Sequence, residues 1–113
     1  MTIEEAKNYC LSLNGTYLCT PFDETTEAIK HRDNNKMFAL FSSLGEKYSI
    51  NLKCEPMEAD FLRSIYQGVV PGYHMNKRHW NTVYLTSDVP DDEILRMIDN
   101  SYNLTEKKQK RKK

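Results

Sequence analysis

The sequence predicts an α+β protein, a two-layer sandwich in which helices cover one face of an antiparallel sheet and leave the other face open. Two observations support this class. Residues 47–54 alternate polar and apolar side chains, which is the period of a strand with one buried and one solvated face. Three stretches, 2–13, 55–66 and 91–102, instead repeat apolar residues at helical spacing. A chain of 113 residues has room for one domain with one modest core.

The first expected element is a helix over residues 2–13. Thr2 and Glu5 have the capping-box spacing, in which both side chains satisfy free amides of the first turn. Gly15 lies where a helix stop is expected. We interpret residues 16–25 as a connection between elements. Its inward anchors are expected to be Tyr17, Leu18 and Phe22.

A three-stranded antiparallel meander is expected next. Residues 27–32 and 36–41 flank the tripeptide Asp33-Asn34-Asn35, which tolerates a tight reversal and therefore predicts a hairpin. A second turn at residues 42–46 leads into the alternating strand 47–54.

The second half of the chain predicts a helix, two strands and a last helix. Residues 55–66 form the helix, residues 68–72 turn the chain, and residues 73–75 and 80–86 form the strands before the helix at 91–102. The expected order is α-β-β-β-α-β-β-α. The helical residues expected to face the core are Met57, Phe61, Leu62, Ile65, Ile94, Leu95, Ile98 and Tyr102.

Residues 68–85 are the stretch in which we expect the function to lie. Gly68, Pro71 and Gly72 fix the backbone shape, since glycine permits positive φ and proline locks φ. A run of hydrogen-bond donors follows and ends at Trp80, the only tryptophan. A turn requires the glycines but not the donors, so the donors indicate a binding segment.

The net charge of zero hides an uneven distribution. Six of the sixteen basic residues lie in 107–113, so residues 1–106 hold ten basic and sixteen acidic residues. A domain with a net charge of −6 is not a general polyanion binder, and any nucleic-acid contact must come from a local patch or from the tail. We expect a domain over 1–105 and a disordered basic tail over 106–113.

Several classes of protein are disfavoured. No run approaches the roughly 18 apolar residues of a membrane span, and the N-terminus has acids where a secretory signal has bases, so we expect a cytoplasmic protein. Three cysteines without CxxC spacing indicate buried small hydrophobes, not a disulfide framework, zinc ribbon or redox site. His74 and His79 do not have a zinc-site spacing, and phosphate-loop and dinucleotide fingerprints are absent. We therefore expect a non-enzymatic protein without cofactor or metal.

Four segments resemble the MmcQ/YjbR family: KMFA at 36–39, NLKCEP at 51–56, PGYHMNKRHWNTV at 71–83 and IDNSY at 98–102. The resemblance extends over nearly all of residues 1–105. It implies a fold related to the type III secretion chaperones, with the element order predicted above, and DNA binding through a double-wing arrangement. The chain departs from the family pattern at Asp33-Asn34-Asn35, where a glycine turn is common, and in its basic tail.

We therefore predict DNA binding through residues 73–82 and the adjoining sheet face. Basic side chains reach phosphates, amides and hydroxyls bond phosphates or base edges, and an exposed tryptophan stacks on an unpaired base or lies along a groove wall. The candidate residues are Lys36, Lys53, His74, Asn76, Lys77, Arg78, His79, Trp80, Asn81 and Thr82. The alternative interpretation is that Tyr73 and Trp80 are core aromatics and that Lys77 and Arg78 form a solvated turn.

A second function stays open on the same sequence. A protein-binding adaptor, monomeric or homodimeric, would use exposed sheet and helix surfaces, and a net charge of −6 suits a basic protein partner better than DNA. Salt separates the two functions, because DNA affinity falls steeply with ionic strength while apolar association changes little.

Overall fold

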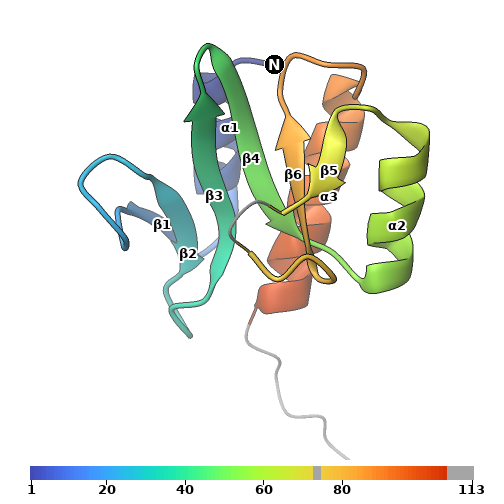
Figure 1. Ribbon diagram of the computed structural model, residues 1–113. Helices are drawn as coiled ribbons and strands as arrows, with labels where there is room; N and C mark the ends of the chain where they lie inside the picture. Colours follow the sequence, from blue (N-terminus) through green and yellow to red (C-terminus); the bar gives the residue numbers. More distant parts are fainter. Residues whose placement is uncertain (73–74, 107–113) are drawn as a thin grey trace, which may run out of the picture.

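The computed structural model describes residues 1–72 and 75–106, apart from the side chain of Leu44. The predicted tail at 107–113, and Tyr73 and His74 of the predicted binding segment, lie outside the described residues. Within the described residues the protein is α+β, with a six-stranded antiparallel sheet and three helices (Figure 1). The predicted fold class is confirmed.

The elements follow one another as α1 (Ile3–Ser12), β1 (Thr16–Cys19), β2 (Ala28–His31), β3 (Met37–Leu44), β4 (Lys47–Lys53), α2 (Pro56–Ile65), β5 (Val69–Pro71), β6 (Trp80–Tyr84) and α3 (Asp91–Thr105). The strands stand side by side in the order β1-β2-β3-β4-β6-β5, and every neighbouring pair is antiparallel.

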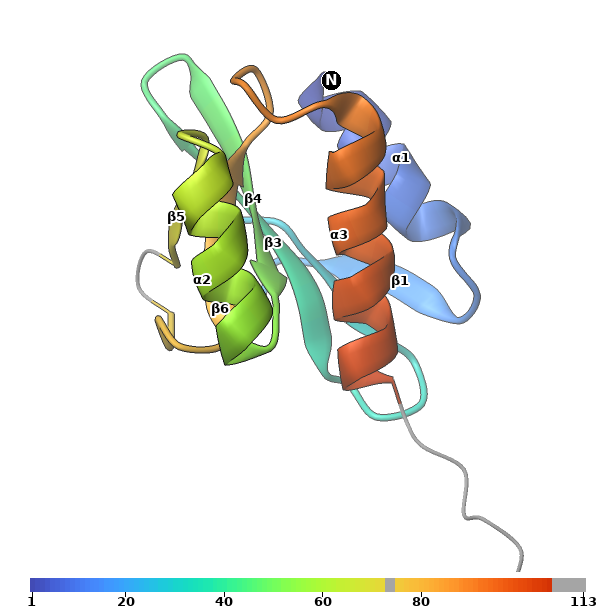
Figure 2. The same cartoon turned by 90° about the vertical axis from the view of Figure 1, so that its right-hand side faces the viewer.

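The helices form one layer and the sheet forms the other. Helix α3 packs across β3 and β4, α1 lies beside β1, and α2 packs against β5 at the far edge (Figures 1 and 2). In the described part of the chain no helix covers the opposite face of the sheet, which is turned toward the viewer in Figure 1. We call this surface the open face.

A β-bulge at Phe38 joins the sheet to α3. Ile29 stands opposite Ala39 and Lys30 opposite Met37, so Phe38 is an extra residue without a partner position on β2. Its ring is fully buried and lies edge-on to Tyr102 of α3, with 5.4 Å between ring centroids. The bulge therefore directs two successive side chains, Phe38 and Ala39, into the core.

Most predicted elements are confirmed. Thr2 and Glu5 form a capping box at the start of α1, and β2, β3 and β4 form the predicted meander. Residues 16–19, however, form an additional edge strand, and residues 69–71 form β5 instead of a turn. The observed order is therefore α-β-β-β-β-α-β-β-α. Pro71 fits because it is the last residue of an edge strand, where the missing amide hydrogen is tolerated.

The predicted apolar stripe of α2 is wrong for three of its four residues. Met57, Phe61 and Ile65 are 88%, 59% and 48% exposed, whereas Leu62 is buried as predicted, together with Ala59. Phe22, expected as an inward anchor, is 68% exposed, and Leu18 is also exposed. Helical spacing identifies an apolar stripe but does not identify its partner, and Ala59 and Leu62 supply the contact here. No helix in the described ranges is long and apolar enough to cross a membrane.

Candidate nucleic-acid interface

Acidic residues are confined to the helices and loops of the described chain. The helices carry eight carboxylates: Glu4, Glu5, Glu58, Asp60, Asp91, Asp92, Glu93 and Asp99. The six described strands carry none, and their only fully charged side chains are Lys30, Lys47 and Lys53. The two layers of the sandwich therefore differ in charge.

The three strand lysines point to the open face. Side chains alternate along a strand, and Ile29, His31, Ile50 and Leu52 all point toward the helix layer. Lys30 lies between the first two of these residues, and Lys53 follows the last, so both project to the opposite side. Lys47 has the same parity as Lys53 on β4. In contrast, the three basic residues of the helices form ion pairs: Lys7 with Glu27 at 2.6 Å, Arg63 with Asp60 at 3.4 Å, and Arg96 with Glu58 at 2.9 Å.

One end of the sheet collects the predicted basic residues. Strand β3 begins directly after Lys36, β4 ends at Lys53, and β6 begins directly after the turn that holds Lys77 and Arg78. Since β3 is antiparallel to β4, and β4 to β6, these positions share one end, which we call the basic end. The described chain also stops at this end, at Glu106, and six basic residues follow it in the sequence (Figure 1). Acidic residues are present here too, at Asp33, Glu55 and Glu106.

Arg63 of α2 holds the turn before β6 in place. Its Nε donates to Oδ1 of Asn81 at 2.6 Å, and its Nη2 donates to the backbone oxygens of Lys77 and Trp80. Within the turn, Oδ1 of Asn76 accepts from the backbone N–H of Arg78 at 3.0 Å. The backbone beneath Lys77 and Arg78 is thus fixed while both side chains remain exposed.

Position 72 requires glycine because the backbone there lies very close to Trp80, and not because φ is positive. A Cβ at this position would lie 2.9 Å from Cβ of Trp80 and 3.0 Å from its backbone oxygen. The glycines with positive φ are Gly15 and Gly45, so the expected use of positive φ at Gly68 and Gly72 is not what the structure shows. Gly72 lets the end of β5 lie directly against Trp80.

The other candidate residues differ in accessibility. Lys36 and Asn76 are exposed; Lys53, His79 and Trp80 are partly buried, and Lys53 stands directly opposite Trp80 in the register of β4 and β6. This pair places a cation beside an aromatic ring at the basic end. Trp80 is therefore neither a fully buried core residue nor a fully exposed platform.

Asn81 and Thr82 are buried, at 2% and 3% exposure, and this corrects their expected role as direct contacts to DNA. Asn81 points toward the helices, where it accepts from Arg63; its Nδ2 has no hydrogen-bond partner among the described residues. Thr82 points to the open face, where its hydroxyl donates to Oδ1 of Asn51. Asn81 is thus directed away from the open face, whereas Thr82 lies at the bottom of it, bonded to Asn51.

Sequence reasoning missed two kinds of residue. Arg63 lies in a helix of mixed charge, and nothing in the local sequence indicates that it contacts residues 77–81. The fold brings it there. Phe22, Ser42 and Asn51 reach the open face from three different elements. The absence of Asp and Glu from every strand is the signal that the sequence did contain.

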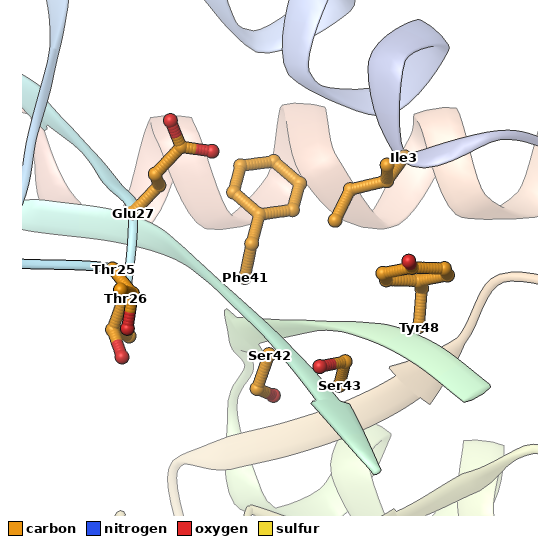
Figure 3. A pocket seen from close by; sticks show the side chains of 8 residues that line it. All are labelled: Ile3, Thr25, Thr26, Glu27, Phe41, Ser42, Ser43 and Tyr48. Carbon is orange, nitrogen blue, oxygen red and sulfur yellow. The ribbon is translucent and has the colours of Figure 1, made fainter. Parts of the chain in front are cut away.

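A further hollow of the described chain lies beside α1, β3 and β4. It has a volume of about 460 Å³, and Figure 3 shows Ile3, Phe41 and Tyr48 drawn together at its apolar side. Its one carboxylate, Glu27, is paired with Lys7 at 2.6 Å. The lining holds no other carboxylate and no histidine, and its remaining titratable group is the phenol of Tyr48. The described residues also contain no cluster of three or more His, Cys, Asp or Glu side chains suited to a metal.

Comparison with known proteins gives a consistent result. Residues 11–104 match the family model described as YjbR. The chain is 35% identical over 102 residues to the YjbR protein of Escherichia coli K12, covering 90% of this chain and 85% of that protein. It is 34% identical over 88 residues to YyaQ of Bacillus subtilis, covering 69% and 74%.

Solved structures agree. A protein from Pseudomonas syringae superposes with a TM-score of 0.85 at 30% identity, covering 94% of this chain and all of that one. The Deinococcus radiodurans protein DR2400 superposes with a TM-score of 0.83 at 30% identity, covering 91% and 77%. The chain belongs to the YjbR family.

Proposed function

We propose that this protein is a non-enzymatic nucleic-acid-binding protein that contacts the phosphate backbone with the basic end of its open face. The observation that carries the proposal is the charge difference between the layers: eight helical carboxylates on one side, and strands with three lysines and no carboxylate on the other. A polyanion approaching the sheet meets an attractive local potential, although residues 1–106 together are acidic. The helix layer repels the same ligand and so directs it to the open face.

Each residue of the basic end has a distinct role in this proposal. Lys77 and Arg78 reach phosphates from a turn whose backbone Arg63 holds, so little order must be gained on binding. Lys53 contacts a further phosphate, and Trp80 beside it offers part of its ring to a sugar or base. Lys36 extends the same edge across β3.

The test is the affinity for fluorescein-labelled DNA, measured by anisotropy at several salt concentrations. It uses the full chain and a chain that ends at Glu106, since the six basic residues after it can supply sequence-independent affinity alone. We expect both chains to bind at low salt, with a slope of log K against log salt of about −0.9 per phosphate contact. Circular dichroism checks that the shorter chain folds.

The double variant Lys77→Ala with Arg78→Ala should bind at least tenfold more weakly and have a shallower salt slope. The charge-matched control is Lys7→Ala with Arg96→Ala, which removes two basic groups from the helix layer. We expect this control to bind no worse than the unmodified protein. Equal losses in the two double variants would indicate a net-charge effect and would remove the basic end from the proposal.

One observation favours a second function, the binding of a protein partner. The exposed stripe of Met57, Phe61 and Ile65 lies on α2 among the carboxylates of Glu58 and Asp60. A second copy of the chain would bring like charges together, so the surface suits a basic amphipathic helix better. A synthetic Leu/Lys amphipathic peptide tests this. Phe61→Ser should abolish its binding and leave DNA affinity unchanged; self-association abolished by Phe61→Ser would instead identify a homodimer.

A further inference from the structure

The open face contains two adjoining hollows. The first, of about 320 Å³, lies between Phe22 and Met75, with Leu40, Ser42 and Asn51 among its lining residues. The second, of about 260 Å³, lies beside Tyr84 and Pro71, with Ser49 in its lining. Ser42 lines both, so the two hollows meet at this residue of β3, and we call the pair the depression. Small-ligand sites start at roughly 300 Å³, so the first hollow suits one planar ring system and little more.

The wall of the first hollow is an aromatic ring presented to solvent. Phe22 is 68% exposed, although it lies in an ordered turn. The carboxylate of Asp23 accepts the backbone N–H groups of Thr25 and Thr26 at 2.8 and 2.6 Å, and both of their hydroxyls at 3.2 and 2.9 Å. These bonds hold the pKa of Asp23 below its ordinary value, so the group stays anionic. The turn therefore presents the ring of Phe22 to solvent, and the carboxylate of Asp23 beside it repels a phosphate. The basic end, in contrast, attracts a phosphate.

The floor of the depression is polar and already satisfied. Asn51 Nδ2 donates to the backbone oxygen of Leu40 at 3.1 Å and to Oγ of Ser42 at 3.3 Å, and its Oδ1 accepts from Thr82. Ser42 and Ser49 share a hydrogen bond at 2.9 Å. Ser42 is exposed, so its hydroxyl remains accessible to a ring edge, as donor or acceptor. The floor tolerates different bases because a hydroxyl can bond either kind of edge.

We infer that the open face binds a single strand of nucleic acid, with one unpaired base stacked on Phe22 in the first hollow and the next base against Tyr84. This inference rests on the proposed function and specifies its ligand. Bases in a duplex are paired and stacked, so none can enter a hollow in a sheet surface without being flipped out. A single strand can place successive bases on aromatic rings while its phosphates follow basic side chains. Phe22 and Tyr84 supply the rings, and Lys53 with Lys77 and Arg78 supplies the charges.

The experiment compares three ligands on the full chain by anisotropy at one low salt concentration: a labelled 12-nucleotide mixed-sequence single strand, oligo-dT of equal length, and the blunt duplex of the mixed sequence. We expect both single strands to bind at least tenfold more tightly than the duplex. Phe22→Ala should weaken single-strand binding by roughly ten- to one-hundredfold, the range found when a stacking ring is removed, and should leave duplex binding unchanged. The matched control is Phe61→Ala, which removes an exposed phenylalanine of α2 and should change neither affinity.

The outcomes separate the two proposals. Equal binding of duplex and single strands, with Phe22→Ala without effect, would overturn the base-stacking inference and leave the proposed function standing. Equal losses for Phe22→Ala and Phe61→Ala would overturn the inference as well. If no ligand binds at low salt, the proposed function fails and the inference fails with it.

Discussion

Nε of Arg63 lies 2.6 Å from Oδ1 of Asn81, so a helix side chain and a buried strand side chain form a direct hydrogen bond. The same guanidinium reaches the backbone oxygens of Lys77 and Trp80. A guanidinium has five donors in a planar fork, which lets one side chain hold both ends of the turn 77–80. The position of α2 therefore determines the backbone geometry of the turn that carries the proposed phosphate contacts, Lys77 and Arg78.

Arg63→Ala is expected to lower the free energy of unfolding by about 2–3 kcal/mol, because hydrogen bonds to a charged group are lost and the buried oxygen of Asn81 is left unpaired. Arg63→Lys should not restore it, since an ammonium cannot reproduce the planar fork. Urea denaturation measures both. The control is Arg96→Ala, which breaks half-exposed ion pairs with Glu58 and Glu93 and should cost less than about 1 kcal/mol. A fully stable Arg63→Lys variant would contradict the assigned role of the fork.

Ser101 gives a second prediction, on the joint between α3 and the sheet. Its hydroxyl is fully buried, donates to the backbone oxygen of Phe38 at 2.6 Å and accepts the backbone N–H of Lys53 at 2.9 Å. Ser101→Ala leaves both backbone groups unpaired and is expected to cost about 2–4 kcal/mol in urea denaturation. Ser64→Ala, which removes an exposed hydroxyl bonded only within its own helix turn, is the control and should cost almost nothing. A loss below 1 kcal/mol for Ser101→Ala would show that water or a backbone shift provides new hydrogen-bond partners for the oxygen of Phe38 and the N–H of Lys53.

Those elements that local chemistry determines were predictable. The capping box of Thr2 and Glu5 and the alternation along β4 each encode an element without reference to the rest of the chain. Strand β1 was missed because its four residues do not alternate in burial, so the segment alone does not indicate its pairing with β2. Strand β5 was missed because Pro71 and two glycines suggest a turn. Edge pairing with β6, a tertiary contact, decides the outcome.

The candidate site was predictable only in part, for the same reason. Lys77 and Arg78 are exposed because a turn of polar residues seldom becomes buried, and sequence alone suffices for that. The burial of Asn81 and Thr82 follows from the position of β6 between β4 and β5, which requires the sheet order. The exposure of Phe61 depends on which face of α2 finds a partner, and helical periodicity does not specify this.

The cysteines give a prediction about reactivity. Burial raises the pKa of the Cys10 thiol to about 12 and that of Cys54 to about 11, so neither forms thiolate near neutral pH. Cys19 is only partly buried. Ellman's reagent at pH 8 should therefore titrate one thiol in the native protein and three after denaturation, with Cys19→Ser removing the native reaction. Rapid labelling of Cys10 or Cys54 in the native state would show that α1 or the end of β4 opens readily.

His31 predicts a dependence of stability on pH. Its ring lies between Phe38 and Tyr102, at 5.0 and 4.7 Å between centroids, and its Nε2 lies 2.8 Å from the hydroxyl of Thr105. That hydroxyl donates to the backbone oxygen of Ser101, so the Nε2–H of His31 donates to it. Burial lowers the pKa of His31, and the carboxylates of Glu106 and Asp33 oppose the shift only partly.

Because the folded-state pKa lies below the unfolded one, the unfolded chain takes up a proton first as the pH falls. The contribution of His31 is therefore complete above about pH 6.5 and is lost as the pH falls through the folded-state pKa. The carboxylates with lowered pKa, Asp23 and Asp88, lose their contributions only below about pH 4 and do not interfere. Urea midpoints at pH 7.5, 6.5 and 5.5 should thus decline for the unmodified protein and change less for His31→Gln. Glutamine cannot titrate, so an equal decline of the urea midpoint in both proteins would assign the acid sensitivity to a group other than His31.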